Sequence, residues 1–364
     1  MDNRELKLLL DRYFSQKVTL RQEEKRKALE VWEGVVKNIL QKVEAKDPRF
    51  KLTGVYSGSY YERAKVKEPN EFDLMLEMEK LKLGSGDQYD SHEDNLGTDP
   101  PLGYTTVMID QGEENEWRPE GCIPGNGNLL SATKVKSLFC RYVHEAITEL
   151  GYSHCIEVKS SGPAVTLKIT VGCKMYSIDL TLAIKDESWP DDADEWKTRH
   201  RGWPTRDLVG AIVRDGCHLV AKRPKQAFTT ESEYFWRYSF SGAEKKLALQ
   251  GERGEEGTCR KKILRILKLL REQYQLTPLT SYHLKTIMFY ERETYPRLSL
   301  WKEDQLAIRF TSALARLRSC LQQRKCPHYF IKDVNLFDSR FDNRYKDLIT
   351  WIDKFQSNPQ NYLK

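Results

Sequence analysis

The sequence predicts an α+β protein that consists of a sheet-forming part followed by a helical part. Three segments have the composition and alternation of β-strands: 71–76, 164–171 and 175–184. From Gly242 to the C-terminal end, helical periodicity replaces this pattern. The character of the chain changes beyond Trp189-Pro190, so we place a boundary near residue 195. We therefore expect a core lobe at 1–195 and a helical lobe at 196–364.

The composition is that of a folded protein with a polar surface. Of the 364 residues, 39% are hydrophobic and 31% are charged, which argues against a disordered chain. No run of about 18 apolar residues is present, so we expect no transmembrane helix and no membrane partner. The start, Met1-Asp2-Asn3, has neither a secretory pattern nor a myristoylation glycine, which favours a cytoplasmic location.

Charge is distributed unevenly along the chain. The net charge is +6, from 59 basic and 53 acidic residues. Segment 90–127 holds nine acids against Arg118 alone, a local charge of −8, so the rest of the chain carries +14. A basic body of this kind suggests a polyanionic partner, although ordinary solubility charge gives the same pattern.

A long helix is predicted near the N-terminus, from about Leu20 to Ala45. Six apolar residues recur along it at helical spacing: Leu29, Trp32, Val36, Ile39, Leu40 and Val43. Asp47-Pro48 ends the helix. Its other faces carry lysines and arginines mixed with glutamates. That pattern fits either a solvated surface or a surface that follows a phosphate backbone.

The stretch from Gly58 to Leu76 carries the predicted chemistry. Gly58-Ser59 opens a turn or helix in which backbone N–H groups and a serine hydroxyl can approach a triphosphate. In the strand that follows, Glu71 and Asp73 share one face and apolar residues share the other. Burial of the apolar face leaves two carboxylates at a rim, where hard cations such as Mg²⁺ bind. Together the two halves favour nucleotidyl transfer.

A third carboxylate would complete this site. In segment 175–184, Ser177, Asp179 and Thr181 alternate with apolar residues, so Asp179 lies on the polar face of its strand. If this strand pairs beside the one that carries Glu71 and Asp73, three acids converge and can hold two cations. Two such ions activate an attacking hydroxyl, neutralise a triphosphate and stabilise leaving pyrophosphate.

The remaining segments predict one long loop and several helices. Segment 90–127 is rich in Gly, Pro, Asp and Glu and predicts a loop with a short strand at 104–109. Ser131-Ala132-Thr133 caps a helix that runs to Leu150. An amphipathic helix is expected from Cys259 to Tyr274. It has a basic face that would contact phosphates if it borders a nucleotide cleft: Lys261, Arg265 and Lys268.

Six motifs occur in order along the chain: Gly58-Ser59-Tyr60-Tyr61-Glu62, Pro69-Asn70-Glu71-Phe72-Asp73, Gly162-Pro163-Ala164-Val165-Thr166-Leu167, Ile178-Asp179-Leu180-Thr181-Leu182-Ala183, Trp236-Arg237-Tyr238-Ser239-Phe240-Ser241 and Ser281-Tyr282-His283-Leu284-Lys285-Thr286. They resemble the Mab-21 group of nucleotidyltransferases, and within it the receptors similar to cyclic GMP-AMP synthase. The likeness runs from about residue 20 to residue 355.

The resemblance implies a two-lobed nucleotidyltransferase fold. A mixed-sheet core with a long N-terminal helix would precede the helical lobe, and the active site would lie in the cleft between them. Glu71, Asp73 and Asp179 would be the catalytic residues and would hold two Mg²⁺ or Mn²⁺ ions. The family also implies a set of substrate-binding residues: Gly58, Ser59, Lys222, Arg237, Glu244, Lys268, Ser281 and Tyr282.

The residue types suit the roles that the resemblance implies. Arg237 would offer a planar fork to the nucleotide, and Lys268 and Ser281 would hold phosphate oxygens. Tyr282 would stack its flat ring on a base. A packing or surface role is the alternative for these residues, above all for Tyr282.

The chain departs from the family in one respect. The vertebrate DNA-sensing enzyme has a zinc-binding insertion of a histidine and several cysteines, placed just before the helix that begins here at Cys259. Segment 250–258 contains neither residue type, and the eight cysteines are scattered without a CxxC pair. We therefore expect mostly buried free thiols and no zinc. Receptors of this family without the zinc insertion include double-stranded RNA sensors, so the resemblance favours double-stranded RNA over double-stranded DNA as the activator.

The resemblance as a whole implies an innate immune sensor of the cytoplasm. Double-stranded nucleic acid, with RNA favoured over DNA, would bind the basic surface and switch on synthesis of a cyclic dinucleotide from ATP, GTP or other nucleoside triphosphates. A STING-like receptor would read the product. Two alternatives stay open: an oligoadenylate-synthetase-like enzyme that makes linear chains, and a non-catalytic Mab-21-type interaction protein. The clustered carboxylates argue against the second, because a binding module does not need acids that repel one another.

Overall fold

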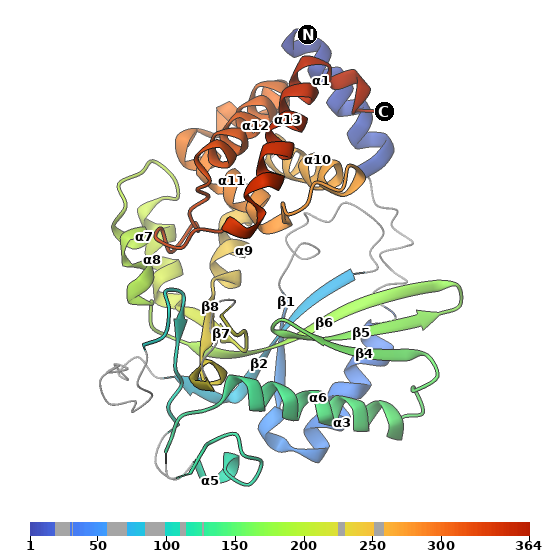
Figure 1. Cartoon of the computed structure of the whole chain (residues 1–364), viewed down its shortest axis with the longest axis vertical. Coiled ribbons are helices and arrows are strands. Elements are labelled where there is room, and N and C mark those ends of the chain that lie inside the picture. The colour runs from blue at the N-terminus through green and yellow to red at the C-terminus, as the bar shows by residue number, and fades with distance from the viewer. Residues whose placement is uncertain are drawn as a thin grey trace.

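The structure is a computed structural model, and it describes residues 1–18, 30, 32–56, 71–83, 99–109, 114–125, 127–224, 230–250 and 258–364. A sheet with two helices beneath it forms one lobe, and a bundle of helices above the sheet forms the other (Figure 1). This arrangement confirms the predicted α+β class with a mixed sheet and a helical C-terminal lobe.

Among the described residues, eight strands form one sheet: β1 (Leu52–Tyr56), β2 (Glu71–Leu83), β3 (Tyr104–Thr105), β4 (Ile156–Ser161), β5 (Ala164–Val171), β6 (Lys174–Asp186), β7 (Cys217–Val220) and β8 (Trp236–Ser239). The main order is β1-β2-β6-β7-β8-β3, and β5 joins β4 to β6. β2 and β6 run parallel, while the other pairs are antiparallel. The two longest strands, β2 and β6, therefore lie side by side at the centre of the sheet.

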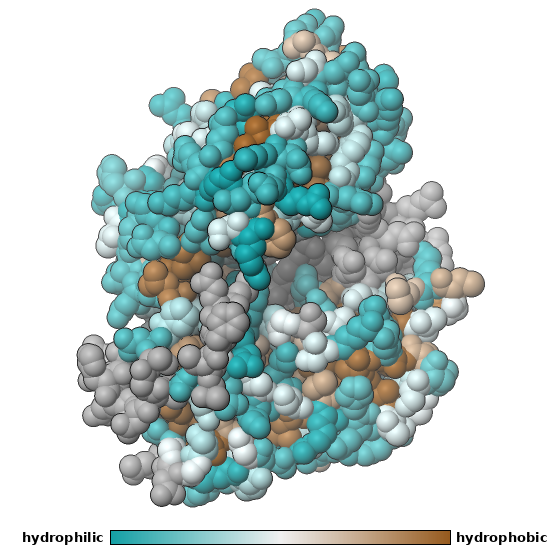
Figure 2. Space-filling model, viewed as in Figure 1, coloured by the Kyte–Doolittle hydropathy of each residue, from teal (hydrophilic) through white to brown (hydrophobic). Residues whose placement is uncertain are grey.

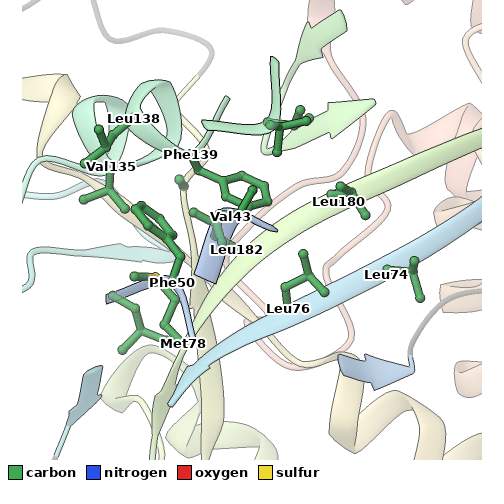
Figure 3. Close-up of a cluster of buried hydrophobic side chains, with 14 of the residues drawn as sticks. Val43, Phe50, Leu74, Leu76, Met78, Val135, Leu138, Phe139, Leu180 and Leu182 are labelled. Atoms are coloured by element: carbon green, nitrogen blue, oxygen red, sulfur yellow. The ribbon is translucent and has the colours of Figure 1, made fainter. Parts of the chain in front are cut away.

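The underside of β2 is apolar, as the alternation predicts. Phe72, Leu74 and Leu76 are at most 3% exposed and belong to the largest hydrophobic core. Figure 3 shows Leu74 and Leu76 of β2 beside Leu180 and Leu182 of β6, with side chains from the helices nearby. Because a shift by one residue would expose this whole set, the core fixes which face of each strand carries the polar residues.

Two helices cover this apolar face: α3 (Lys37–Lys46) and α6 (Ala132–Glu149). Ser131 caps α6, since its hydroxyl accepts from the backbone N–H of Lys134 at 3.2 Å. α3 follows a π-helical turn at Trp32–Val36 and ends before Asp47. The rest of the long helix expected at 20–45 lies outside the described residues.

The other helices are α1 (Asn3–Tyr13), α5 (Glu114–Trp117), α7 (Asp194–Thr198), α8 (Arg206–Asp215), α9 (Ser241–Leu249), α10 (Cys259–Gln273), α11 (Ser281–Thr294), α12 (Leu306–Gln323) and α13 (Asp342–Ser357). Helices α10 to α13 form the helical lobe around a second core. No helix in the described ranges is both long and apolar enough to cross a membrane.

The N-terminal helix α1 packs on the helical lobe, although it precedes the sheet in sequence (Figure 1). Leu6, Leu10 and Tyr13 are buried among side chains of α10 and α12. The Tyr13 hydroxyl donates to Gln273 Oε1 at 2.7 Å. This contact joins two parts of the chain that the periodicity of the sequence could not relate.

A third, aromatic-rich cluster links the sheet to the helices. Trp196 of α7, Phe240 and Phe330 are all buried in it, and the rings of Phe240 and Phe330 stack with centroids 4.6 Å apart. Phe240 directly follows β8 and precedes α9. The cluster therefore fixes the start of α9 relative to the end of the sheet.

Several elements differ from the predicted ones in detail. β5 spans 164–171 as predicted, and β6 is longer at both ends than the predicted 175–184. β4 was not predicted, because Ile156–Ser161 is short and contains only two apolar residues beside four polar ones. All eight cysteines are free, and four of them are buried: Cys122, Cys217, Cys259 and Cys326.

Candidate active site

The parallel pair β2 and β6 brings two predicted acids together. Asp73 and Asp179 are direct partners in the register of this pair, and Glu71 is opposite Ser177. Asp73 is exposed and Asp179 is half-buried, while their strand neighbours on the other face are buried. The Glu71 side chain lies outside the described residues. We call Asp73 and Asp179 the acid rim.

Thr166 of β5 orients one of these carboxylates. β5 pairs with β6 on the side away from β2, and Thr166 is opposite Asp179 in that register. The Thr166 hydroxyl donates to Asp179 Oδ1 at 2.5 Å. A donor at this oxygen holds the carboxylate in one orientation. Thr166 lies within a motif that carried the resemblance, but its role became visible only when β5 and β6 were paired.

A pocket of about 240 Å³ opens beside the acid rim and brings Asp73 together with two predicted cations, Lys222 and Arg237. Arg237 lies on β8 opposite Val220, the last residue of β7. Lys222 follows that strand, and its backbone N–H donates to the Val220 carbonyl at 2.8 Å. The end of β7 and the start of β8 thus place two positive side chains at a pocket that also contains a carboxylate.

Two serines of the pocket were not predicted as site residues. Ser239 and Ser241 line it together with Arg237. The Ser241 hydroxyl donates to Met75 Sδ of β2 at 3.3 Å, which ties the start of α9 to the strand of Asp73. The signal was present in the sequence, because Arg237, Ser239 and Ser241 alternate with two aromatic residues.

In the view of Figure 2, hydrophilic residues cover most of the surface of the helical lobe. Thr181 and Pro163 complete the polar and small residues of the pocket wall. Thr181 follows Asp179 on the same face of β6 and is opposite Met75 in the register. The pocket therefore lies over the polar face of the two central strands.

Glu244 and Tyr282 lie in a separate buried group with Lys285 and His328, which we call the buried quartet. The Glu244 carboxylate accepts from Lys285 Nζ at 2.8 Å and is also hydrogen-bonded to the Tyr282 hydroxyl. The Tyr282 hydroxyl lies 2.7 Å from His328 Nε2. Glu244 and His328 are each 6% exposed. Four polar side chains from three segments are thus linked to one another, with Glu244 and His328 buried and Tyr282 and Lys285 half-buried.

The pKa values of Glu244 and His328 are both shifted by burial and by neighbouring charged or polar groups. Burial alone would raise the pKa of Glu244, but Lys285 and the Tyr282 hydroxyl outweigh it and the pKa is lowered. Burial lowers the pKa of His328 to about 4; Glu244 opposes this shift and the charge of Arg237 adds to it. Glu244 is therefore ionised and His328 neutral at physiological pH.

The structure does not bring every predicted residue to the pocket. Lys268 is only 3% exposed within α10, so it does not share the solvated face that Lys261 and Arg265 were expected to form with it. Ser281 begins α11 directly after its capping residue Thr280. Neither lines the pocket beside the acid rim. Gly58 and Ser59 lie outside the described residues.

The donor set at the acid rim fits a hard divalent cation. Two carboxylates on adjacent strands supply the oxygen ligands that Mg²⁺ and Mn²⁺ prefer. In the described ranges, which leave out the Glu71 side chain, no three His, Cys, Asp or Glu side chains form a metal-binding group. A metal site here would thus draw on Asp73, Asp179 and a third ligand from outside the described side chains.

Comparison with protein families agrees with both lobes. Residues 60–250 match the Mab-21 protein nucleotidyltransferase domain, and residues 259–354 match the Mab-21 protein HhH/H2TH-like domain. The first match alone covers more than half of the chain and contains the acid rim and the pocket. Domains of this type generally use divalent metal ions and nucleoside triphosphate substrates. The chain therefore belongs to the Mab-21 family of nucleotidyltransferases.

Proposed function

We propose that this protein is a nucleic-acid-activated synthase that joins two nucleoside triphosphates, such as ATP and GTP, into a cyclic dinucleotide. One observation carries the proposal: Asp73 lines a pocket together with Lys222 and Arg237, and Asp179 is the register partner of Asp73 on the neighbouring strand. Carboxylates for cations and cations for phosphates are the two parts that nucleotidyl transfer needs side by side.

Each part of the chain has an assigned task in this proposal. Glu71, Asp73 and Asp179 would hold two Mg²⁺ or Mn²⁺ ions, which supply charge neutralisation at the reacting phosphate when bound. Thr166 keeps the Asp179 carboxylate in the orientation seen in the structure. Lys222 and Arg237 bind phosphate oxygens, Arg237 through two parallel hydrogen bonds. Gly58 and Ser59 form the phosphate cradle.

The helical lobe supplies the second half of the cleft. Tyr282 stacks on a base, with Glu244 as its hydrogen-bonded neighbour. Ser281 holds phosphate oxygens of a bound nucleotide, whereas the burial of Lys268 argues against the phosphate contact that the resemblance implies for it. In this proposal, the linear intermediate turns over in the same cleft and is closed in a second transfer, so that two pyrophosphates are released.

Double-stranded RNA is the proposed activator, since the chain has no cluster of cysteines for a zinc site before α10. A-form RNA is recognised through its backbone and shape, and this binding weakens as salt rises. On α3, Lys42 and Lys46 are ion-paired with Glu145 and Glu149 of α6. These two lysines are therefore poorer candidates for RNA contacts than cations elsewhere on the basic surface.

The product assay tests the proposal. Purified protein is incubated with all four labelled triphosphates and Mg²⁺ or Mn²⁺, with double-stranded RNA, double-stranded DNA or no nucleic acid. We expect a phosphatase-resistant cyclic product with RNA, and none from Asp179→Asn. Asp304→Asn, an exposed acid before α12, is the matched control and should retain activity.

The same assay separates the alternatives. A ladder of phosphatase-sensitive linear products would indicate an oligoadenylate-synthetase-like enzyme. Absence of any product under all conditions would favour a non-catalytic interaction protein. If activation by RNA were unchanged between low and physiological salt, binding through a basic surface would be wrong.

A further inference from the structure

A histidine that no motif singled out contacts the residue assigned to base stacking. Tyr282 lies in the first turn of α11, and His328 follows the loop after α12. The Tyr282 hydroxyl is 2.7 Å from His328 Nε2, and the two rings lie 5.6 Å apart at an angle of 31°. His328 is 6% exposed, so protein atoms surround its ring almost completely.

The other ring nitrogen of His328 fixes where the imidazole proton lies. Nδ1 is 3.2 Å from the backbone nitrogen of Phe330 and 3.0 Å from that of Ile331. Both backbone groups can only donate, so Nδ1 must accept and carries no proton. The proton of the neutral ring is therefore on Nε2, which donates to the Tyr282 hydroxyl oxygen.

The Tyr282 hydroxyl also interacts with Glu244. Its oxygen is occupied by His328 Nε2–H, and the hydroxyl is hydrogen-bonded to the ionised Glu244 carboxylate, which can only accept. Lys285 Nζ balances the charge of that carboxylate at 2.8 Å. The donors thus run in one direction, from His328 to Tyr282 to Glu244, and this order fixes the hydroxyl from two sides.

We infer that His328 is a positioning residue that fixes the ring of Tyr282 for base stacking by donating to its hydroxyl. The stacking role of Tyr282 belongs to the proposed function, and the inference depends on it in that respect. His328 itself would not contact the nucleotide, because its ring is enclosed by Tyr282, Phe240 and the backbone of 330–331.

The benefit of this arrangement is preorganisation. A tyrosine held only at Cα and Cβ loses side-chain freedom when a base stacks on it, and that loss weakens binding. A ring held at its far end has lost this freedom before the nucleotide arrives. The expected consequence is a lower KM for the stacked nucleotide, with little change in kcat, since no reacting atom is involved.

Two substitutions separate the two hydrogen-bonding roles of the His328 ring, which are donation from Nε2 to Tyr282 and acceptance at Nδ1 from the backbone. His328→Asn places an amide oxygen near the Nδ1 position, so it can still accept from Phe330 and Ile331 but is too short to reach Tyr282. His328→Gln is long enough to place an amide N–H near the Nε2 position. His144→Asn, an exposed histidine on α6, is the matched control.

The first measurement needs no nucleotide. Protein with 3-fluorotyrosine at position 282 should give one narrow ¹⁹F resonance in the wild type, in His328→Gln and in His144→Asn. His328→Asn should give a broadened or shifted resonance, with a melting temperature close to that of the wild type. An unchanged resonance in His328→Asn would show that His328 does not fix the ring and would overturn the inference.

The second measurement links the ring to substrate. We expect His328→Asn to raise KM for the stacked triphosphate about tenfold with kcat within about twofold, the loss of one hydrogen bond. His328→Gln should recover most of this loss. In a Tyr282→Phe background, which keeps the ring but lacks the hydroxyl, His328→Asn should have no further effect. An equal effect in both backgrounds would overturn the inference.

The two measurements fail independently of the proposed function. If the wild type makes no nucleotide product, the proposed function is wrong, and the ¹⁹F spectra still decide whether His328 fixes Tyr282. If the wild type makes the cyclic product and the spectra do not respond to His328→Asn, the function stands and the positioning role is wrong.

Discussion

The acid rim and the buried quartet both consist of charged and polar side chains, but the fold treats them in opposite ways. Asp73 is exposed and Asp179 half-buried on a rigid pair of strands. Glu244 and His328 are each 6% exposed and are hydrogen-bonded within their own group. The carboxylates of the acid rim remain accessible to ligands, whereas the polar groups of the buried quartet are hydrogen-bonded to one another.

We therefore expect the acid rim to take part in the reaction and the buried quartet to hold side chains in position. An accessible carboxylate contributes little to stability, so its replacement should change activity and leave the fold intact. A buried charge that loses its partner remains desolvated and uncompensated, so its replacement should change stability. Four experiments test this contrast, and they are given in order of decreasing expected effect.

Replacement of Asp179 by Asn should have the largest effect on activity. Loss of one metal ligand removes several kcal/mol of transition-state stabilisation, which corresponds to a roughly thousandfold lower rate. The midpoint of urea unfolding should move little, because the Asp179 side chain is only half-buried. Initial rates and urea titrations of the same preparation measure both. Substantial activity in the variant would remove Asp179 from the metal site.

Replacement of Glu244 by Leu should have the largest effect on stability. Lys285, whose side chain is 13% exposed, would lose its partner, and the free energy of unfolding should fall by about 3 kcal/mol. The double variant Glu244→Leu/Lys285→Met should be more stable than the single one, because no unpaired charge remains. Urea unfolding of the four members of this cycle gives the coupling. Additive effects would show that the pair does not interact.

Acid should destabilise the buried quartet. The pKa of His328 falls from about 6.5 in the unfolded chain to about 4 in the folded one, so the unfolded state binds the extra proton first. Above pH 6.5 the neutral His328 ring does not reduce the free energy of unfolding. As the pH falls from 6.5 towards 4, this free energy decreases by about 3 kcal/mol. Glu244, with its lowered pKa, adds a loss in the same direction below its unfolded value.

Unfolding free energies measured between pH 4 and pH 7.5 test this window. The wild type should lose stability across it, and His328→Gln should lose less, because glutamine does not titrate. The groups facing His328 include Glu244 and Tyr282 on two helices and Arg237 on β8, so Glu244→Gln provides the control for the carboxylate. A wild type and a His328→Gln variant with the same pH profile would contradict the assignment.

Replacement of Thr166 by Val should have the smallest of the four effects. The variant keeps the shape of the side chain and the β-propensity of the strand but removes the donor to Asp179 Oδ1. A hydrogen bond to a charged group is worth about 1.5 kcal/mol or more, so activity should fall about tenfold. Thr166→Ser keeps the hydroxyl and should restore most of it. Equal rates for Val and Ser would exclude an orienting role.

Local sequence patterns predicted strands β2, β5 and β6, helices α6 and α10, and the faces of the strands. Alternation placed Asp73 and Asp179 on polar faces, and helical periodicity separated the bundle from the sheet. These features are local, because they depend on a repeat of two or 3.6 residues along a single segment. The motif likeness added the family, which the domain matches confirmed.

Which strand and helix faces contact one another is determined by tertiary packing and cannot be predicted from local patterns. The register that sets Asp73 beside Asp179 depends on a parallel pairing across about a hundred residues, and the contact between Tyr282 and His328 spans 46. The burial of Lys268 likewise follows from the packing of α10 within the bundle and not from its own periodicity. Partners so far apart in sequence are chosen by the cores that bury both elements, and a local pattern contains no information about that choice.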